Sequence, residues 1–217
     1  MKERGMIFNG EMVRAILEGR KTQTRRPIKW KQTRFTEIGE REDGSNWPWS
    51  EDTEKVCDYW HPCPFGAVGD RIWVRETFGW QIRRDPVGGT GEFRVYRATT
   101  PDAVRYQTAS GEAAPMKWVP SIHMPRRASR ITLEITDVRV ERLHSISERD
   151  ALREGLFQLP ASGRYCLQPG MQYFGMASHS AKEVYSWLWA SIYGEESWNA
   201  NPWVWVIEYK RVEGGAL

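Results

Sequence analysis

The sequence lacks any apolar run long enough for a membrane span or a secretory signal. Charged residues recur at short intervals along its 217 residues. The first eight, MKERGMIF, already include three charged residues. A bilayer span needs about 20 consecutive apolar residues, and a signal peptide needs an apolar stretch of about 7 to 15. We therefore expect a cytoplasmic protein with no signal peptide and no membrane contact.

Cysteine is scarce, and neither sign of charge dominates. Three cysteines, an odd number, favour a reducing compartment over a disulfide framework. Cys57, His61 and Cys63 form the pattern C-x3-H-x-C, which matches no common structural zinc site and has no fourth ligand nearby, so we expect no metal. Lys plus Arg (31) exceed Asp plus Glu (28) by only 3. Any recognition of phosphate must therefore come from local clusters.

Tryptophan, in contrast, is abundant. The chain has 12, within a hydrophobic content of 40% that is typical of a globular protein. Trp47, Trp49, Trp60 and Trp80 fall in segments without a clear helix or strand pattern. We expect these side chains to hold such segments against the body of the protein or to wall a pocket, where an aromatic face can stack on a pyrimidine.

Capping residues and apolar spacing predict three short helices. Asn9 is a good cap for a helix over residues 10–18, whose apolar residues recur at helical spacing before Gly19 ends it. Ser147 with Asp150, and Ser180 with Glu183, have the spacing of capping boxes at the start of two further helices.

Four segments rich in β-branched and aromatic residues are predicted strands: 71–78, 93–97, 130–143 and 202–212. Within the third, the apolar positions change phase near Thr136 and Asp137, which predicts a bulge or a tight bend. Small barrels turn their corners in this way. We expect an α+β fold in which a small mixed β-barrel carries a few short helices.

Long segments rich in Gly, Pro, Trp and charge separate these elements. We treat them as loop insertions at about 27–70, 79–127 and 157–179 of a single domain that spans 1–217, because no repeat or linker divides the chain. Loops of this length inside a domain usually serve a function or are disordered.

Residues 19–26, Gly-Arg-Lys-Thr-Gln-Thr-Arg-Arg, are the most informative stretch. They place an amine, two hydroxyls and guanidinium groups just after a predicted helix. If the neighbouring Arg20, Arg25 and Arg26 bring the pKa of Lys21 down toward neutrality from about 10.4, its amine can take the proton of Thr24 and make it a nucleophile. This pairing requires Lys21 to lie in the turn that leaves the helix, with the strand beginning after it. The alternative is a basic turn that binds phosphate without chemistry.

Glu154 is the second unusual placement, because a carboxylate in the last turn of a helix faces the negative end of the helix dipole. If the fold brings it over the turn at 21–26, it can hold Lys21 or move a proton to a departing amine. The alternative is a solvated glutamate paired with Arg149 or Arg153.

The order of a short helix, Gly19-x-Lys21-x-x-x-x-Arg26, a strand and a closing Val-Ile-Glu-Tyr-Lys at 206–210 resembles the ASCH superfamily, which shares the PUA-like barrel. The superfamily usually has Glu where this chain has Thr24. Lys-Thr-x-Thr-x-Arg resembles instead the bacterial ASCH amidohydrolases of N4-acetylcytidine. In those enzymes the lysine activates the second threonine, and a helix-borne glutamate, matched here by Glu154, completes the site.

The resemblance is specific over about eight residues and looser over roughly half of the chain. Over its whole length the sequence is more similar to larger ASCH proteins of phages and prophages, through 63–78, 120–143 and 201–210. Those relatives mostly lack an assigned activity. The catalytic expectation therefore depends on three aligned positions: Lys21, Thr24 and Glu154.

Several further residues are candidates for substrate contacts. Arg26 can steady an oxyanion, and Trp73 shares one face of a predicted strand with Arg75. Glu76, on the opposite face, can accept from a cytosine amino group or from Lys21, or it can form a structural ion pair with an arginine. His123 lies in a predicted loop, where it can contact a base or phosphate or serve no function.

The leading prediction is an amidohydrolase that removes the acyl group from N4-acylated cytosine nucleosides, a small-molecule substrate, without metal or organic cofactor. The alternative is a non-catalytic module that binds RNA or a modified base, since PUA-like barrels are mostly readers. A third possibility is a phage accessory factor that binds a host protein through the tryptophan-rich insertions.

Overall fold

The computed structural model describes residues 1–29, 36–52, 57–84, 89–108 and 110–212. Its α-helices are α1 (Gly10–Leu17), α2 (Glu148–Arg153), α3 (Ala181–Tyr193) and α4 (Glu195–Asn199). Short 3-10 turns are η1 (Ser121–His123), η2 (Arg126–Ala128), η3 (Leu143–Ser145) and η4 (Met171–Phe174). The protein is therefore α+β and rich in strands, as the sequence predicts.

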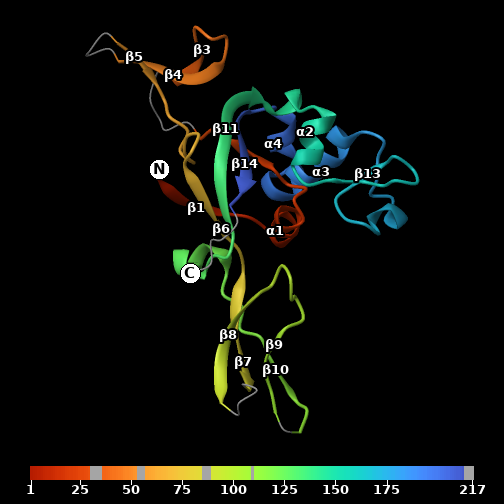
Figure 1. Cartoon of the computed structure of the whole chain (residues 1–217). Helices are drawn as coiled ribbons and strands as arrows, with labels where there is room; N and C mark the ends of the chain where they lie inside the picture. The colour runs from red at the N-terminus through yellow and green to blue at the C-terminus, as the bar shows by residue number, and fades with distance from the viewer. Residues whose placement is uncertain (30–35, 53–56, 85–88, 109, 213–217) are drawn as a thin grey trace.

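A five-stranded mixed sheet forms the body of the molecule (Figure 1). Its order is β1 (Glu3–Ile7), β6 (Arg71–Arg75), β11 (Thr132–Arg142), β14 (Trp203–Arg211) and β2 (Gln23–Pro27). β1 runs parallel to β6, and every other neighbouring pair is antiparallel. The register of β11 against β14 shifts between Ile135 and Asp137, which confirms the predicted bulge.

The sheet is covered on both faces, and the residues of strand β14 show what covers each face. Trp205 and Ile207 point into one core, where they join Val13 and Ile16 of helix α1. Val204 and Val206 point into a second core with α2 and α3. A strand that is buried on both faces is apolar along its whole length, as 203–207 is. The sheet thus places α1 and α2 within reach of the same end of β2.

The predicted closed barrel is not what the described residues form. β1 and β2 are the two edges of the central sheet, and among the described strands no ladder joins them. The expected α+β class is confirmed, while the small barrel is replaced by an open, covered sheet.

The predicted loop insertions contain β-structure of their own, so the expectation of long irregular loops was wrong. One insertion forms a three-stranded sheet of β3 (Thr36–Glu40), β4 (Asn46–Asp52) and β5 (Cys57–Trp60). The others form the pairs β7 (Phe78–Arg84) with β8 (Thr90–Tyr96), β9 (Val104–Gln107) with β10 (Ala113–Pro115), and β12 (Phe157–Gln158) with β13 (Tyr165–Cys166). The alternating patterns of these segments are short, and hairpins close locally through their own turns.

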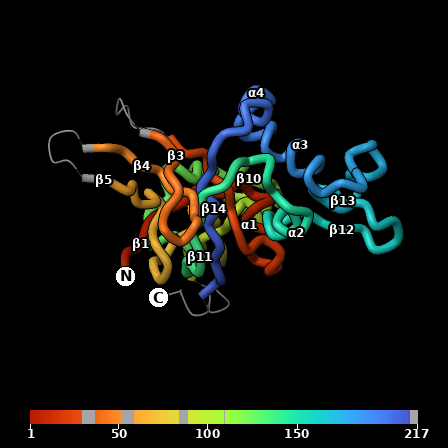
Figure 2. The backbone as a smooth tube through the Cα atoms, turned by 90° about the horizontal axis from the view of Figure 1, so that it is seen from above, coloured from red at the N-terminus to blue at the C-terminus, as the bar shows by residue number. Residues whose placement is uncertain are grey.

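These insertions give the molecule an elongated outline (Figure 1). The pairs β7–β8 and β9–β10 project from one end of the body, and β3–β5 project from the other. Seen from above, β3–β5 and β12–β13 lie on opposite sides of the central sheet (Figure 2). Within the described part of the chain, no helix combines the length and apolarity that crossing a bilayer requires.

Candidate active site

The turn after helix α1 brings Lys21 into the interior. Asn9 caps the helix by accepting a hydrogen bond from the Met12 amide at 2.8 Å. Gly19 ends it with a φ of 76°, a conformation that favours glycine. The Lys21 amide then bonds to the Ala15 carbonyl at 3.0 Å, and strand β2 begins two residues later. Lys21 therefore lies in the turn and Thr24 in the strand, as their pairing requires.

Helix α2 ends directly over this turn. The Thr22 amide donates to the Arg153 carbonyl at 2.9 Å. Gly155, with a φ of 107°, has no side chain to separate the two segments. A Cβ there would lie 2.9 Å from the Cβ of Ala15 and 3.3 Å from that of Lys21. The glycine thus permits the close approach that delivers Glu154, the last residue before it, to Lys21.

Lys21 and Glu154 form a buried ion pair. The Nζ atom lies 2.7 Å from Oε2 of Glu154 and 2.9 Å from its carbonyl oxygen. The two side chains are 0% and 2% exposed. The alternative of a solvated glutamate paired with Arg149 or Arg153 therefore does not hold, because Glu154 is buried and its carboxylate faces Lys21.

Burial lowers the pKa of Lys21, since an ammonium loses its water of hydration there. The nearby charges of Arg26 and Arg25 lower it further, while Glu154 opposes the shift by its charge and its hydrogen bond. The expected effect of the neighbouring arginines is thus confirmed for two of them. The balance places the amine closer to the neutral form that a general base requires.

Arg25 is a member of this cluster whose role the sequence did not reveal. Its side chain is 0% exposed and forms ion pairs with Glu154 at 3.3 Å, Glu141 at 3.1 Å and Asp150 at 3.5 Å. Its buried Nε has no hydrogen-bond partner among the described residues. Strand pairing and the position of α2 bring the three carboxylates around Arg25. The sequence on either side of Arg25 gives no sign of them.

Thr24 occupies a very small pocket beside this cluster. It is 1% exposed and lines a cavity of about 10 Å³ together with Arg25, Arg26, Glu154 and Tyr185. That volume suits a single water molecule. The described residues include no hydrogen bond between the Thr24 hydroxyl and the Lys21 amine. Thr24 and Lys21 therefore both adjoin Glu154, and the expected direct contact between them is not formed in this conformation.

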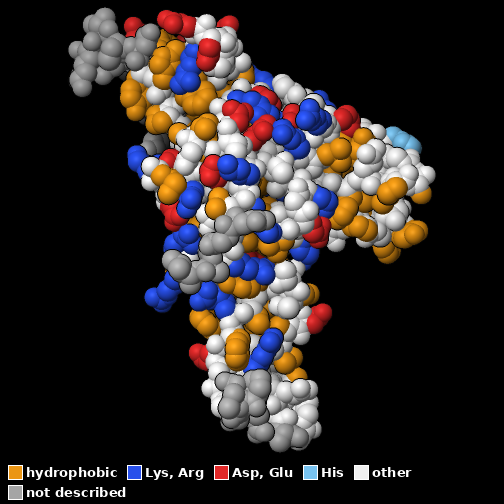
Figure 3. Space-filling view, in the orientation of Figure 1, with side chains coloured by type: hydrophobic (Ala, Val, Ile, Leu, Met, Phe, Trp, Pro, Cys, Tyr) orange, Lys and Arg blue, Asp and Glu red, His pale blue; other side chains and the backbone are white. Residues whose placement is uncertain are grey.

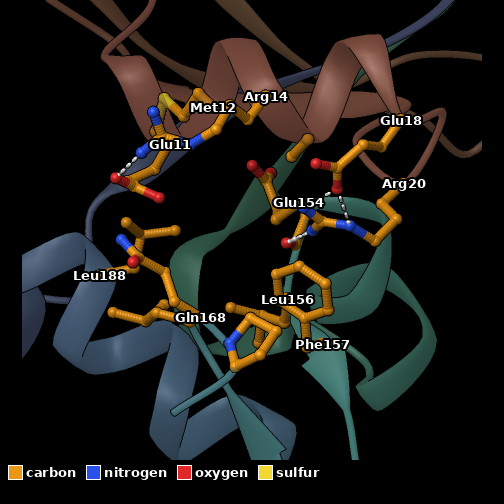
Figure 4. Close-up of a pocket in the computed structure, with 14 residues that line it drawn as sticks. Glu11, Met12, Arg14, Glu18, Arg20, Glu154, Leu156, Phe157, Gln168 and Leu188 are labelled. Atoms are coloured by element: carbon orange, nitrogen blue, oxygen red, sulfur yellow. Dashed lines mark hydrogen bonds and ion pairs between the residues drawn. The ribbon is translucent and has the colours of Figure 1, made fainter. Parts of the chain in front are cut away.

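A larger pocket adjoins the small one. It measures about 380 Å³, within the range of small-molecule sites, and it lies between α1, the end of α2 and α3 (Figure 4). Met12, Glu154 and Leu188 line both pockets. Glu154 projects toward α1 at the centre of this view. Glu154 of the buried ion pair thus lines both pockets, whereas Lys21 lines neither.

Arg20 shapes the mouth of the larger pocket. Its guanidinium lies over the Phe157 ring at 3.5 Å from the centroid and forms an ion pair with Glu18 at 2.6 Å. It also donates to the Gly155 carbonyl. This side chain therefore links the end of α1, the end of α2 and β12 around the opening.

The remaining predicted contacts lie apart from the buried pair, with one exception. Arg26 lines the Thr24 pocket and donates to the Tyr193 hydroxyl at 3.2 Å. Trp73 lies on β6, which two strands, β11 and β14, separate from β2. Glu76, which follows β6, forms a bidentate ion pair with Arg130 at 2.9 and 3.0 Å, so the structural role holds rather than a contact with Lys21. His123 is exposed on η1. The structure does not bring these three residues to the cluster.

Tyr185 was also not anticipated. It comes from α3, is 3% exposed and lines the Thr24 pocket. Burial, followed by the charge of Glu154, raises its pKa well above the ordinary value, so it is a neutral hydroxyl beside the cluster. The apolar face of 181–193 could have placed it in the core, while its nearness to Glu154 depends on tertiary packing.

Metal binding finds no support among the described side chains, which include no cluster of three or more His, Cys, Asp or Glu able to hold an ion. Of the C-x3-H-x-C pattern, the Cys57 side chain lies outside the described residues. No protein-family model matches the chain, and neither a curated protein nor a solved structure matches it. The ASCH resemblance therefore stays a prediction.

Proposed function

We propose that this protein is an amidohydrolase that removes the acyl group from N4-acylated cytosine nucleosides, converting N4-acetylcytidine to cytidine and acetate. The observation that carries the proposal is the buried Lys21–Glu154 ion pair, because its carboxylate residue, Glu154, lines the same small pocket as Thr24. Two ionisable side chains held out of water next to a cavity are typical of functional sites. The ASCH resemblance supplies the reaction and the order of the parts.

The chemistry needs no group from outside the chain other than water. The neutral amine of Lys21 takes the proton of the Thr24 hydroxyl as that oxygen attacks the acyl carbon. The C–N bond then breaks, and the exocyclic nitrogen leaves with a proton delivered through Glu154. Water then attacks the resulting threonyl ester while Lys21 takes its proton. The bond between the acyl carbon and the Thr24 oxygen breaks, Lys21 returns the proton to that oxygen, and acetate departs. Arg25 or Arg26, whose Nε atoms are buried without a partner in the described chain, can donate to the oxyanion.

Substrate access requires the two pockets to join. The cavity at Thr24 holds about one water, while the adjoining pocket has about 380 Å³. Met12 and Leu188 stand in the shared wall. Methionine is unbranched and adopts several rotamers at low cost, so a change at Met12 opens the route to Thr24. We place the pyrimidine in the larger pocket with its acyl group directed through this wall.

The test is an assay of N4-acetylcytidine hydrolysis, monitored through the change in absorbance, with the wild type and three variants. Lys21→Ala and Thr24→Ala should lower kcat/KM by about 100-fold or more, since each removes a reacting group. Thr22→Ala is the matched control because it removes the neighbouring hydroxyl, which lines neither pocket, and it should retain activity. Absence of turnover by the wild type, or full turnover by either active-site variant, overturns the proposal.

A reader of RNA or modified bases is the competing function. The geometry does not support a reader in which the basic turn at residues 21–26 binds phosphate. Lys21 and Arg25 are fully buried and already paired with carboxylates, so neither reaches a polynucleotide backbone. Binding without hydrolysis would favour the reader.

A further inference from the structure

A second, larger hollow lies on the opposite side of the central sheet from α3. It measures about 880 Å³ and lies between the β3–β4–β5 sheet and the body, where Val138 of β11 and Trp205 of β14 form its floor. None of its lining residues lines the pockets around Glu154. We refer to it as the insertion groove.

The insertion groove is basic. Four cationic residues line it, namely Lys2, Arg4, Lys29 and Arg41, against a single carboxylate, Asp70. Asp70 pairs with Arg4 at 3.2 Å. Across the described part of the chain, the other three form no ion pair, and the carboxylate on which Arg41 acts by its charge, Asp43, does not line the groove. On the face of the molecule seen in Figure 3, Lys and Arg side chains (blue) lie among apolar ones (orange). An excess of three positive charges in one groove suits an anionic ligand.

The groove also presents aromatic faces beside these cations. The guanidinium of Arg41 lies 4.0 Å from the centroid of Trp47 and 5.3 Å from that of Trp60. Trp47 is held in place by an edge contact with Trp205 at 5.0 Å and by a hydrogen bond to the His61 carbonyl at 2.7 Å. Tyr59, at the rim, is 52% exposed. The Tyr59 ring is therefore open to a ligand, and the half-buried rings of Trp47 and Trp60 line the groove beside it.

Cations interleaved with aromatic faces in a groove are what single-stranded nucleic acid requires, since its phosphates need neutralising and its unpaired bases stack. An acidic peptide would use the cations alone. A duplex stacks its bases on one another, so they could not stack on the aromatic side chains of the groove.

We propose that the insertion groove binds single-stranded nucleic acid, with Lys2, Lys29 and Arg41 at the phosphates and Tyr59 and Trp60 against the bases. This inference stands apart from the proposed hydrolysis. It explains what the β3–β4–β5 insertion adds to the body: an open surface for a polynucleotide, whatever reaction takes place at Lys21.

The test is fluorescence anisotropy with a labelled single-stranded oligonucleotide of mixed sequence, titrated with the full chain at several salt concentrations. Tyr59→Ala should weaken binding about tenfold or more, as loss of one stacked base does. Lys29→Glu should weaken it as well and reduce the slope of log Kobs against log salt by about 0.7 for the lost phosphate contact. A duplex of the same length should bind more weakly than the single strand.

Each variant has a matched control outside the groove. Tyr173→Ala removes a tyrosine that is 84% exposed on η4, and Lys117→Glu reverses an exposed charge after β10; both should bind like the wild type. Equal losses with these controls, no binding at low salt, equally tight binding of duplex, or displacement by a polyglutamate peptide at matched charge would overturn the inference. Hydrolysis of free N4-acetylcytidine should not change in Tyr59→Ala or Lys29→Glu, so failure here is distinguishable from failure of the hydrolase proposal.

Discussion

Replacing Glu154 by glutamine isolates the charge of the buried pair. The substitution keeps the size of the side chain and one carbonyl acceptor for Lys21, but it leaves the lysine, at 0% exposure, with no carboxylate in contact. Removing one partner of a buried ion pair typically costs about 3–5 kcal/mol, because the other charge remains out of water. Arg25 limits the damage, since it keeps Glu141 and Asp150 at 3.1 and 3.5 Å. We therefore expect a loss of about 3 kcal/mol at neutral pH, toward the lower end of that range.

The pH dependence of this loss is specific to the lysine. Burial already holds the pKa of Lys21 in the folded protein below its ordinary value of 10.5, and Glu154 is the main group that raises it. Without Glu154 the pKa falls further. Between the folded and unfolded pKa values the unfolded chain binds more protons, so stability rises with pH over that interval. The variant's deficit in free energy of unfolding should therefore shrink as the pH rises from the pKa of Lys21 in the folded variant toward its pKa in the folded wild type, both of which lie below 10.5.

Urea denaturation at pH 7 and at about pH 9.5 measures both quantities. Glu134→Gln is the matched control, because Glu134 pairs with the 63% exposed Lys210 at the surface and such a pair contributes less than about 1 kcal/mol. Two results would refute a buried Lys21 with a lowered pKa. One is that Glu154→Gln lowers the free energy of unfolding at pH 7 by no more than the control does, and the other is that its loss of stability is independent of pH.

Two of three further predictions concern the supports of the site, and the third concerns Glu76, which lies apart from it. Gly155→Ala should destabilise the protein by about 1–3 kcal/mol more than Gly175→Ala in urea denaturation. Both glycines have positive φ, but only at Gly155 would the added Cβ meet a neighbour, the Cβ of Ala15 at 2.9 Å. Equal losses would count against the close approach of α1 and α2. Ser147→Ala should cost about 1 kcal/mol in the same assay, since its hydroxyl accepts from the Asp150 amide at 3.1 Å, and no loss would show that the cap is dispensable. Glu76→Gln should lower the melting temperature by breaking the bidentate pair with Arg130 while KM for N4-acetylcytidine stays unchanged; a raised KM would return Glu76 to the substrate.

The sequence predicted the elements of the body well and the overall closure poorly. Capping at Asn9 and Ser147, the phase change at Ile135–Asp137 and the apolar run of β14 are local signals, and the structure shows each of them. Whether edge strands meet depends on the twist and tilt of the whole sheet, which no local pattern encodes. The insertions were mistaken for loops because strands of 2 to 7 residues leave little periodicity to detect.

The site shows the same division. The octapeptide drew attention to Lys21 and Thr24 by composition, and the dipole-opposed position of Glu154 was a local signal that something other than helix stability retains it. Arg25, Glu141 and Asp150 meet only because β2, β11 and α2 come together. Trp73 and Glu76 were assigned to the site without knowledge of the strand order. In the sheet, β11 and β14 lie between β6 and β2.

The measurement that tests the central claim most directly is rapid-quench analysis of the wild type and Thr24→Val during turnover of N4-acetylcytidine. Release of cytidine should show a burst in the wild type, and mass spectrometry of the quenched protein should find one acetyl group on the peptide that contains Thr24. The valine variant should show neither. Turnover by Thr24→Val at the wild-type rate would contradict the claim that this hydroxyl, activated by Lys21, attacks the acyl carbon.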